Sequence, residues 1–362
     1  DRQLPDQYEG MLEQVFPETA PGNFTLDAVS GKWVWTTFYP YQWDLNYHNP
    51  AVLLAMLENM FELANRGVEI FRLDAAIYAW KELGTHCRNL PQTHALLQVF
   101  RAAMSIVAPA VALKAEAMAG ARHLTKYFGD GDSQGKECQL AYHNAVMAAL
   151  WDSLATGTVR PATKMLADLP QKPAGTSWIY YARCHDDIGW GALRDSKGAN
   201  WGADDLHLNH LWRFYAGETT DSFARGRRFQ VTEGEAFAGS NGTLASLAGL
   251  EAAYEQTGSS EAVAVEAAVA RILLLHAVPA ALDGIPLIYM GDEWALLNDY
   301  QHAEDPTYAD GRWLHRPTMP ADIGALKEPR KAVAHRVFAA LKTLLKARAA
   351  QAVFHAEIPV HY

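Results

Sequence analysis

Three carboxylates in this chain have the types and positions needed for acetal chemistry. Asp74 and Glu116 each end a short apolar segment, and Asp186 comes shortly after a third. In a retaining glycosidase, one ionised carboxylate attacks the anomeric carbon, while a second protonates the leaving oxygen and then activates the incoming hydroxyl. A single aspartate at such a position is more often a cap or an ion-pair partner. The three together indicate a site that cleaves a glycosidic bond.

The neighbours of two of these carboxylates suit different roles. Arg72 precedes Asp74 by two residues, so in a strand both side chains point to one face. There the guanidinium favours the ionised, nucleophilic form of Asp74. Glu116 lies between two alanines, an apolar neighbourhood that favours the protonated acid.

The segments that must position these groups alternate with amphipathic helical sequence. Helices are predicted from Pro50, with Gly67 as the C-cap, and from Pro91, with apolar residues spaced for burial. Strands are predicted at residues 68–74, 110–116, 139–142, 178–183 and 285–290. Because parallel strands need crossover connections, which are usually helices, this alternation predicts an α/β fold with a parallel sheet.

Two parallel architectures compete, an open doubly wound sheet and a (β/α)8 barrel. No GxGxxG turn follows any predicted strand, so the dinucleotide-binding open sheet loses its main support. The polar residues instead follow the carboxyl ends of the strands, where barrel enzymes keep their chemistry. The pattern favours the barrel. It breaks in residues 188–260, which are rich in Gly and Asn and predict a subdomain inserted between strand and helix.

Composition excludes several other classes of protein. The chain has 362 residues, enough for two to three domains or for one large barrel with insertions. Its 49% hydrophobic and 20% charged residues exclude intrinsic disorder. A net charge of −10 argues against nucleic acid or an anionic membrane as the main partner.

The cysteines predict no disulfide or zinc site, and the apolar segments predict no membrane span. Cys87, Cys138 and Cys184 contain no CxxC pair, so we predict neither a disulfide framework nor a structural zinc site, and we expect the three as small buried residues. The most apolar stretch, residues 263–290, is interrupted by four polar or charged side chains. We therefore predict no membrane span, and no signal peptide is visible.

The ordered motifs resemble those of a known family. Residues 71–75 (FRLDA), 114–117 (KAEA), 185–187 (HDD) and 284–293 (GIPLIYMGDE) resemble the motifs of the α-amylase family of glycoside hydrolases. Further segments look like those of amylosucrases and their sucrose-hydrolase relatives, and the similarity covers nearly the whole chain. They are residues 35–38, 42–47, 80–85, 89–92, 185–190, 222–226 and 311–317.

The resemblance implies a TIM-type (β/α)8 barrel, of which this chain holds strands four to eight. The first three strands, a pocket aspartate and an Asn-His motif would fall upstream of residue 1. The implied domains are residues 1–48 as the end of a domain B-like insertion, 49–187 as barrel strands four to seven, 188–260 as a B′-like subdomain, 261–350 as strand eight with flanking helices, and 351–362 as the start of a C-terminal domain. Five strands cannot close such a barrel. We therefore expect residues 1–362 alone to be inactive and poorly soluble.

The resemblance also implies roles for individual residues. Asp74 matches the nucleophile, Glu116 the general acid/base, and Asp186 the carboxylate that stabilises the oxocarbenium-like transition state. The implied substrate contacts are Arg72 and His185 in the glucose pocket, Phe38 and Gln42 near the fructosyl side, Arg312 at the pocket floor and Asp187 toward the acceptor. Leu208 and Gly239 stand where amylosucrases carry arginines that face the glucan acceptor. No organic cofactor is implied, and we predict no metal site.

The expected function is a sucrose-cleaving retaining glucosyltransferase. It would pass glucose from a glucosyl-Asp74 intermediate to an α-glucan or maltooligosaccharide acceptor, or to water, and release fructose. A sucrose hydrolase with little polymer synthesis is one alternative, and a non-catalytic protein or inactive fragment with an amylase fold is another. Nucleic acid and membranes are not expected as partners. The sequence does not distinguish a cytoplasmic from a secreted bacterial protein, and it leaves the oligomeric state open.

Overall fold

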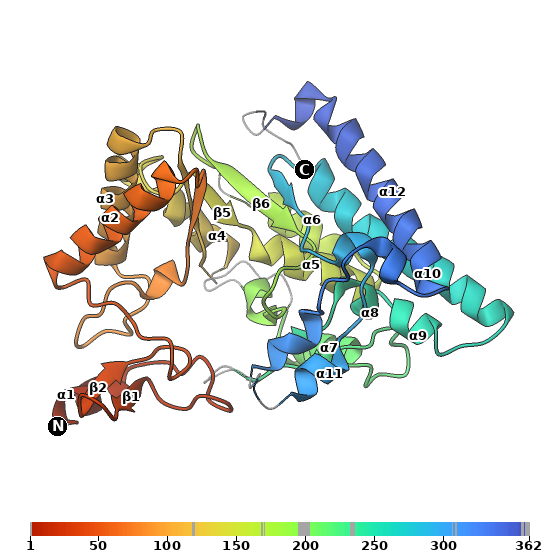
Figure 1. The fold of residues 1–362 in the computed structure, drawn as a ribbon, viewed down its shortest axis with the longest axis horizontal. Helices are drawn as coiled ribbons and strands as arrows, with labels where there is room; N and C mark the ends of the chain where they lie inside the picture. Colours follow the sequence, from red (N-terminus) through yellow and green to blue (C-terminus); the bar gives the residue numbers. More distant parts are fainter. Residues whose placement is uncertain are drawn as a thin grey trace. The chain divides into compact units, whose positions relative to one another are not determined.

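The chain forms two compact units. The structure, a computed structural model, describes residues 2–117, 120–167, 169, 171–194, 203–231, 236–305, 307, 310–355 and 358. The first unit comprises Asp1–Tyr142, Pro170–Ser177 and Gln230–Glu235, and the second comprises His143–Leu169, Trp178–Phe229 and Ala236–Tyr362. Figure 1 shows the elements of both units along the chain.

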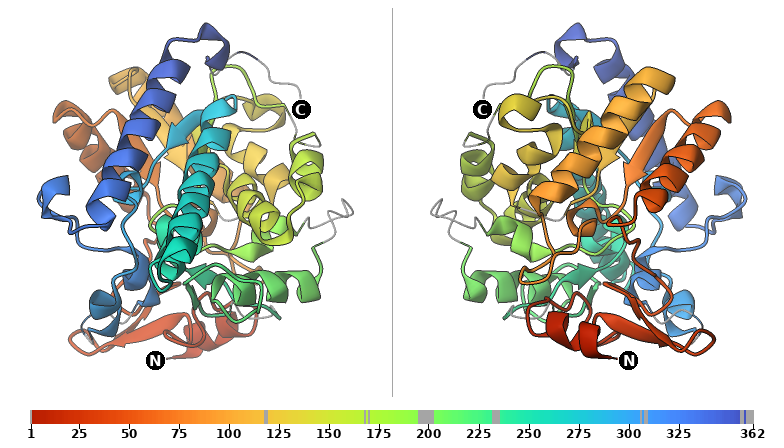
Figure 2. Two further views of the ribbon diagram at one scale, coloured as in Figure 1. Left: turned by 90° about the vertical axis from the view of Figure 1, so that its right-hand side faces the viewer. Right: turned by 90° about the vertical axis from the view of Figure 1, so that its left-hand side faces the viewer.

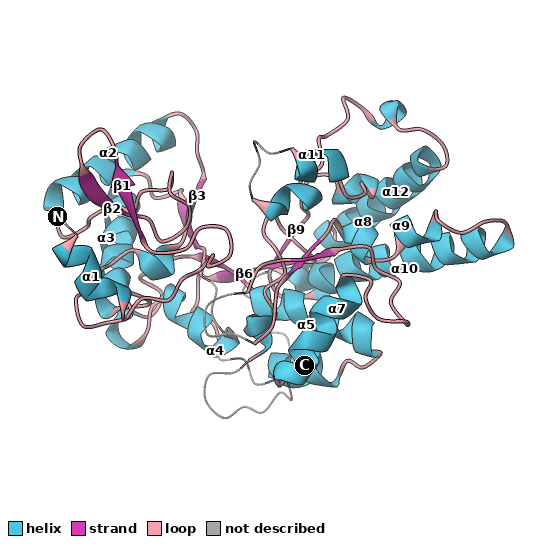
Figure 3. Cartoon of the chain, turned by 90° about the horizontal axis from the view of Figure 1, so that it is seen from below, coloured by secondary structure: helices cyan, strands magenta, loops and turns pink. Residues whose placement is uncertain are grey.

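An aromatic hairpin opens the first unit. The helix α1 (Gln3–Glu9) lies beside the antiparallel strands β1 (Phe24–Asp27) and β2 (Lys32–Trp35) (Figure 3). The ring of Tyr8 on α1 meets the ring of Trp35 edge-on, with centroids 4.8 Å apart. Ring packing of this kind buries apolar area and joins the helix to the hairpin.

The rest of the first unit is a run of β and α elements. Its strands β3 (Ile70–Leu73), β4 (Ala112–Ala115) and β5 (Leu140–Tyr142) pair in parallel, β3 with β4 and β4 with β5. The helices α2 (Pro50–Asn65) and α3 (Pro91–Val107) lie side by side (Figure 1). Shorter elements follow the strands. They are η1 (Ala76–Tyr78), α4 (Ala121–Leu124), η2 (Thr125–Phe128) and η3 (Gly131–Ser133).

Local chemistry explains the limits of these helices. The side chain of Asn49 accepts a hydrogen bond from the Ala51 amide at 3.1 Å, and Pro50 takes the first helical position of α2. Gly67 follows the helix with φ of +98°. In α3, the residues predicted to face the core are buried, which confirms the period of the pattern: Leu96, Leu97, Phe100 and Met104.

The second unit is mostly helical around two parallel strands. These strands are β6 (Ser177–Tyr181, in this unit from Trp178) and β9 (Ile285–Leu287), paired from Ile179 with Ile285. The other elements are α5 (Asn144–Thr156), α6 (Arg160–Ala167), η4 (Trp190–Leu193), α7 (Asp205–Tyr215), β7 (Arg227–Arg228), β8 (Ser240–Asn241), α8 (Leu244–Leu247), α9 (Leu250–Ala253), α10 (Ser259–Ala281), η5 (Asp292–Trp294), α11 (Tyr300–Glu304), η6 (Gly311–His315), η7 (Ile323–Ala325), α12 (Arg330–Ala349) and η8 (Ala352–Phe354).

Two long helices cover one side of β9. Figure 2 shows α10 and α12 running side by side. Among the described residues, α10 is the one helix whose length and composition would suit a membrane span, although a helix in a protein core has the same composition. It contacts α12, α9 and β9.

The five predicted barrel strands are confirmed, and each is shorter than its apolar segment. β3 ends at Leu73 and β4 at Ala115, so Asp74 and Glu116 stand just beyond the last paired residues. Two of the three cysteines are buried as expected, and Cys184 is half-buried. The domain boundaries inferred from the sequence stay a prediction.

Candidate active site

The first unit brings Asp74 and Glu116 to the ends of neighbouring parallel strands. Oε2 of Glu116 accepts a hydrogen bond from the backbone N–H of Ala75 at 2.8 Å, so the glutamate lies against the peptide that follows Asp74. The chain turns there, because Ala75 has a left-handed φ of +47°. The Glu116 amide in turn donates to the Leu73 carbonyl at 3.1 Å. The Glu116 carboxylate is therefore anchored to the turn that follows Asp74.

Positive charge lies beside this turn. A guanidinium nitrogen of Arg72 donates to Asp74 Oδ1, as the two-residue spacing predicts. Lys114 is the register partner of Arg72 on β4, and its Nζ donates to the hydroxyl of Tyr142 at 2.8 Å. The Arg72 guanidinium lies 5.9 Å from the centre of the same Tyr142 ring. The face that carries Asp74 thus also carries two cations and one phenol.

Phe38 and Gln42 lie in the same unit but in different surroundings. The Phe38 ring meets that of Tyr78 at right angles, with centroids 5.7 Å apart, and so contacts η1, which follows Asp74 by one residue. Burial raises the pKa of Tyr78 to about 12, so it is a neutral phenol. Gln42 is exposed, and its Oε1 accepts from the Tyr39 amide at 3.3 Å.

The second unit groups the other predicted residues after β6. Arg312, on η6, donates through Nε to Asp187 Oδ1 at 3.1 Å, and the same nitrogen lies 3.6 Å from Asp186. Its Nη1 lies 3.3 Å from Asp310, whose side chain also caps η6 by accepting from the Arg312 amide. His185 Nε2 is 3.3 Å from Asp186 Oδ2. Arg312 is thus the centre of an acidic cluster.

Burial and charge oppose each other in this cluster. Burial raises the pKa of Asp187, although Arg312 acts in the opposite direction. Burial lowers the pKa of Arg312, but the carboxylates of Asp187, Asp186 and Asp310 outweigh it and raise that pKa overall. The guanidinium therefore stays charged, and its position is determined by the three acids.

The two positions expected to lack acceptor-facing arginines differ from each other. Leu208 is fully buried in α7, so a side chain at this position packs in the core of the unit. Gly239 lies beside Asp187, because a Cβ added to it would be 3.0 Å from Oδ2 of that carboxylate. For a larger side chain to fit at position 239, either the Asp187 side chain or the backbone at position 239 would have to shift.

Three residues of these groups were not singled out from the sequence. They are Tyr142, Asp310 and Arg316, whose Nη2 lies 3.8 Å from Asp186. Arg316 falls inside the motif at residues 311–317 and Asp310 directly precedes it, so that segment was the available signal. Tyr142 ends β5, and only the pairing of β4 with β5 brings it to Lys114.

One group of residues has the spacing of metal ligands. Among the described residues, the Sγ of Cys184, a ring nitrogen of His185 and a carboxylate oxygen of Asp186 lie within 4.8 Å of one another. Burial raises the pKa of the Cys184 thiol to about 12, so the sulfur keeps its proton at neutral pH. Because metals bind the thiolate, this environment does not suit a thiolate ligand.

The amino-acid sequence of the chain matches that of a known family. The sequence pattern of the α-amylase catalytic domain matches residues 4–187, which is half of the chain. The chain belongs to the α-amylase family. Its fold is accordingly the (β/α)8 barrel of that catalytic domain, of which the described residues supply five strands. Enzymes of this family act on glycosidic bonds.

Curated relatives within the family align with about half of this chain or with nearly all of it. The glucosylglycerate phosphorylase of Allomeiothermus silvanus is 28% identical over 354 residues, covering 96% of this chain and 59% of its own. The trehalose synthase/amylase TreS of Mycolicibacterium smegmatis is 37% identical over 174 residues, covering 48% of this chain and 29% of its own. The chain thus spans between about a third and three fifths of the length of these relatives.

A solved structure supports the fold. The sucrose 6F-phosphate phosphorylase of Thermoanaerobacter thermosaccharolyticum superposes with a TM-score of 0.67 at 19% identity, over 94% of this chain and 61% of the other. At this identity the likeness concerns the fold alone.

Proposed function

We propose that this α-amylase-family chain belongs to an enzyme that transfers glucose from sucrose by a retaining mechanism. The observation that carries the proposal is the hydrogen bond between Glu116 and the amide next to Asp74, since a retaining enzyme needs its two carboxylates about 5 Å apart. The segments that resemble those of amylosucrases support sucrose as the donor.

In this proposal Asp74 and Glu116 divide the chemistry. A carboxylate oxygen of Asp74 forms a bond to the anomeric carbon while the bond from that carbon to the fructosyl oxygen breaks. Glu116 gives its proton to the departing fructose and then, as carboxylate, takes a proton from the incoming hydroxyl. That hydroxyl, from water or an α-glucan, displaces Asp74 and restores the enzyme.

The other predicted residues bind and stabilise the sugar. Asp186 would stabilise the oxocarbenium-like transition state, and Arg72 with His185 would hold glucose. Asp187 and Arg312 would act together, because the contact between them orients both. Phe38 and Gln42 would line the fructosyl side. We expect short oligosaccharides and glucose rather than long glucan, because neither Leu208 nor Gly239 supplies an acceptor-facing cation.

A second candidate differs only in the acceptor. The likeness to a glucosylglycerate phosphorylase runs along 96% of the chain and favours inorganic phosphate as the group that takes glucose from Asp74. Glucose 1-phosphate would then be the product.

The experiment that separates the candidates uses the full-length protein. It would be incubated with sucrose, glucosylglycerate or trehalose, with and without inorganic phosphate, and the products resolved by chromatography. We expect fructose from sucrose in the absence of phosphate. Strictly phosphate-dependent release of glucose 1-phosphate would establish the phosphorylase instead, and activity on trehalose alone would contradict both.

A further inference from the structure

Two donors from η6 and its end hold the carbonyl group of His185. Nε2 of His315 lies 2.9 Å from this oxygen, and Nε of Arg316 lies 2.8 Å from it. The carbonyl belongs to the planar peptide that joins His185 to Asp186. The two hydrogen bonds therefore orient the backbone from which the Asp186 side chain projects.

Arg183 braces this arrangement from the end of β6. Its Nη1 donates to the His315 carbonyl at 3.1 Å and to the Cys184 carbonyl at 3.2 Å, and its Nε donates to Asp292 Oδ1 at 2.9 Å. The guanidinium also lies 4.5 Å from the ring centre of Tyr289. Arg183 and Asp292 are 3% and 1% exposed, so water does not compete for this ion pair. A buried pair of this kind favours a single geometry.

The protonation state of His315 makes it a donor. Burial and the nearby charges of Arg183, Arg316 and Arg312 lower its pKa well below the usual range, so the imidazole is neutral. A neutral imidazole carries one N–H. Because the partner of Nε2 is a carbonyl oxygen, which only accepts, the proton is on Nε2. His315 therefore donates to His185.

We propose that His315 is a positioning residue that acts on Asp186 through the carbonyl of His185. The inference rests on the proposed function, in which Asp186 stabilises the transition state. Loss of the His315 donor would remove one of these two hydrogen bonds to the His185 carbonyl and so loosen Asp186. Such small displacements lower the rate because transition-state stabilisation depends on preorganised geometry. The carboxylates of Asp74 and Glu116 would keep their own contacts.

The test compares two substitutions in the full-length protein. His315→Met removes the donor, whereas the amide of His315→Gln can still donate to the His185 carbonyl. We expect His315→Met to lower kcat by about 10- to 100-fold with KM changed less than about threefold, a change in barrier rather than in ground-state binding. His315→Gln should recover to within about tenfold of wild type.

Comparing two glucosyl substrates separates this positioning role from acid catalysis. α-Glucosyl fluoride needs no proton on its leaving group, so it bypasses the acid Glu116. It does not bypass Asp186, which acts on the sugar ring. The loss in kcat for His315→Met should therefore be similar with sucrose and with α-glucosyl fluoride.

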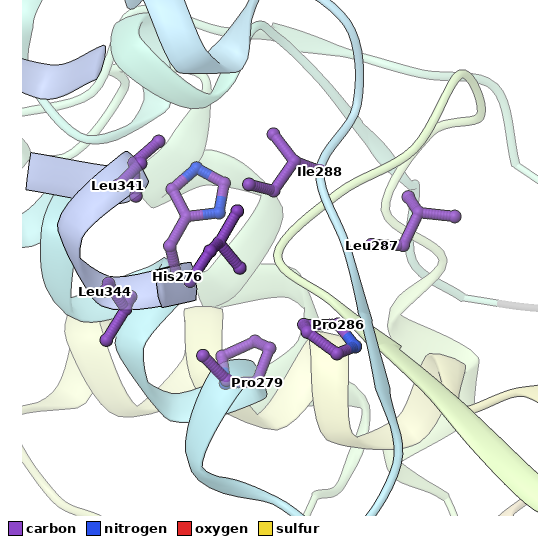
Figure 4. Close-up of a pocket in the computed structure, with 9 residues that line it drawn as sticks. His276, Pro279, Pro286, Leu287, Ile288, Leu341 and Leu344 are labelled. Carbon is purple, nitrogen blue, oxygen red and sulfur yellow. The ribbon is translucent and has the colours of Figure 1, made fainter. Parts of the chain in front are cut away.

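His276 supplies a matched control from the same unit. It is a buried histidine on α10, and it lines a small apolar pocket with Pro279, Pro286 and Leu341 (Figure 4). Its Nε2 has no hydrogen-bond partner among the described residues. His276→Met removes a buried imidazole without removing such a donor, so its kcat should equal that of wild type even where stability changes.

The outcomes separate this inference from the proposed function. Equal kcat for His315→Met and wild type would overturn the inference, as would a similar loss in His276→Met or a loss confined to sucrose. A wild-type protein inactive toward both donors would overturn the proposed function and this inference with it.

Discussion

Single residues in the first unit differ in ways that suit different roles. Asp74 is exposed and pairs with Arg72. Glu116 is half-buried and accepts from the Ala75 amide. The two carboxyl groups thus stand in different environments at the ends of neighbouring strands, as the proposed roles of nucleophile and acid require.

Replacing Asp74 tests the nucleophile. In the full-length protein, Asp74→Asn should lower fructose release from sucrose by at least about a thousand-fold, roughly 4 kcal/mol of barrier, because an amide does not attack the anomeric carbon. The rate is measured by enzymatic assay of fructose. Activity within about tenfold of wild type would exclude Asp74 from this role.

Replacing Glu116 should cause a different failure. Glu116→Gln removes the acid but keeps the nucleophile, so α-glucosyl fluoride should still react once and label Asp74. Intact-mass spectrometry checks for one added hexose, and peptide mapping locates it. Asp74→Asn treated in the same way is the control and should stay unlabelled. Absence of the adduct in Glu116→Gln would argue against the acid/base assignment.

At the scale of elements, one side chain holds the junction between α10 and β9. Arg348, near the end of α12, donates to the carbonyls of Leu282 at 3.1 Å, Gly284 at 2.5 Å and Phe354 at 3.3 Å, and also to that of Ala280. The last carbonyls of a helix have no partner within it, so an external donor must satisfy them. Arg348 does so and links two helices to a strand.

Removal of this donor should destabilise the second unit. We expect Arg348→Met to lower the free energy of unfolding by about 1.5–3 kcal/mol, the usual range for a hydrogen bond that involves a charged group. Chemical denaturation measures the change. Arg336→Met on the same helix is the matched control. It breaks the exposed ion pair with Glu266, which water and salt screen, so its effect on stability should be much smaller than that of Arg348→Met. Equal losses in the two variants would contradict the role of Arg348.

The whole molecule carries buried histidines that make stability depend on pH. Burial lowers the pKa of His276 to about 4, with a smaller effect from the charge of Arg183. Burial likewise lowers the pKa of His143 to about 4. Each group has its usual pKa near 6.5 in the unfolded chain, so the unfolded state binds protons first as the pH falls. Their contribution to stability is complete above about pH 6.5 and is lost on the way down to about pH 4.

Substitution of His276 isolates one of these contributions. His276→Gln does not titrate, so its free energy of unfolding should fall less than that of wild type between pH 6.5 and 4. The difference should be about 3 kcal/mol over this range, since each pKa unit corresponds to about 1.4 kcal/mol. Denaturant titrations at several pH values measure it. Parallel pH profiles for variant and wild type would show that His276 is not buried in its neutral form.

The sequence by itself determined the local features of this protein. Apolar runs and helix caps such as Asn49 with Pro50 predicted the strands and helices, because hydrophobic period and capping are properties of neighbouring residues. The same patterns placed Asp74, Glu116 and Asp186 just after strands, and the two-residue spacing predicted the contact of Arg72 with Asp74.

Only the tertiary structure decided which distant groups meet. Glu116 reaches the amide of Ala75, and the imidazole of His315 reaches the carbonyl of His185, 130 residues away in the chain. Arg312 gathers its three carboxylates, and Gly239 lies against Asp187. No spacing in the sequence encodes these contacts, because they depend on the register of strand pairs and on how η6 packs against the end of β6. Side-chain packing, rather than local pattern, sets their geometry.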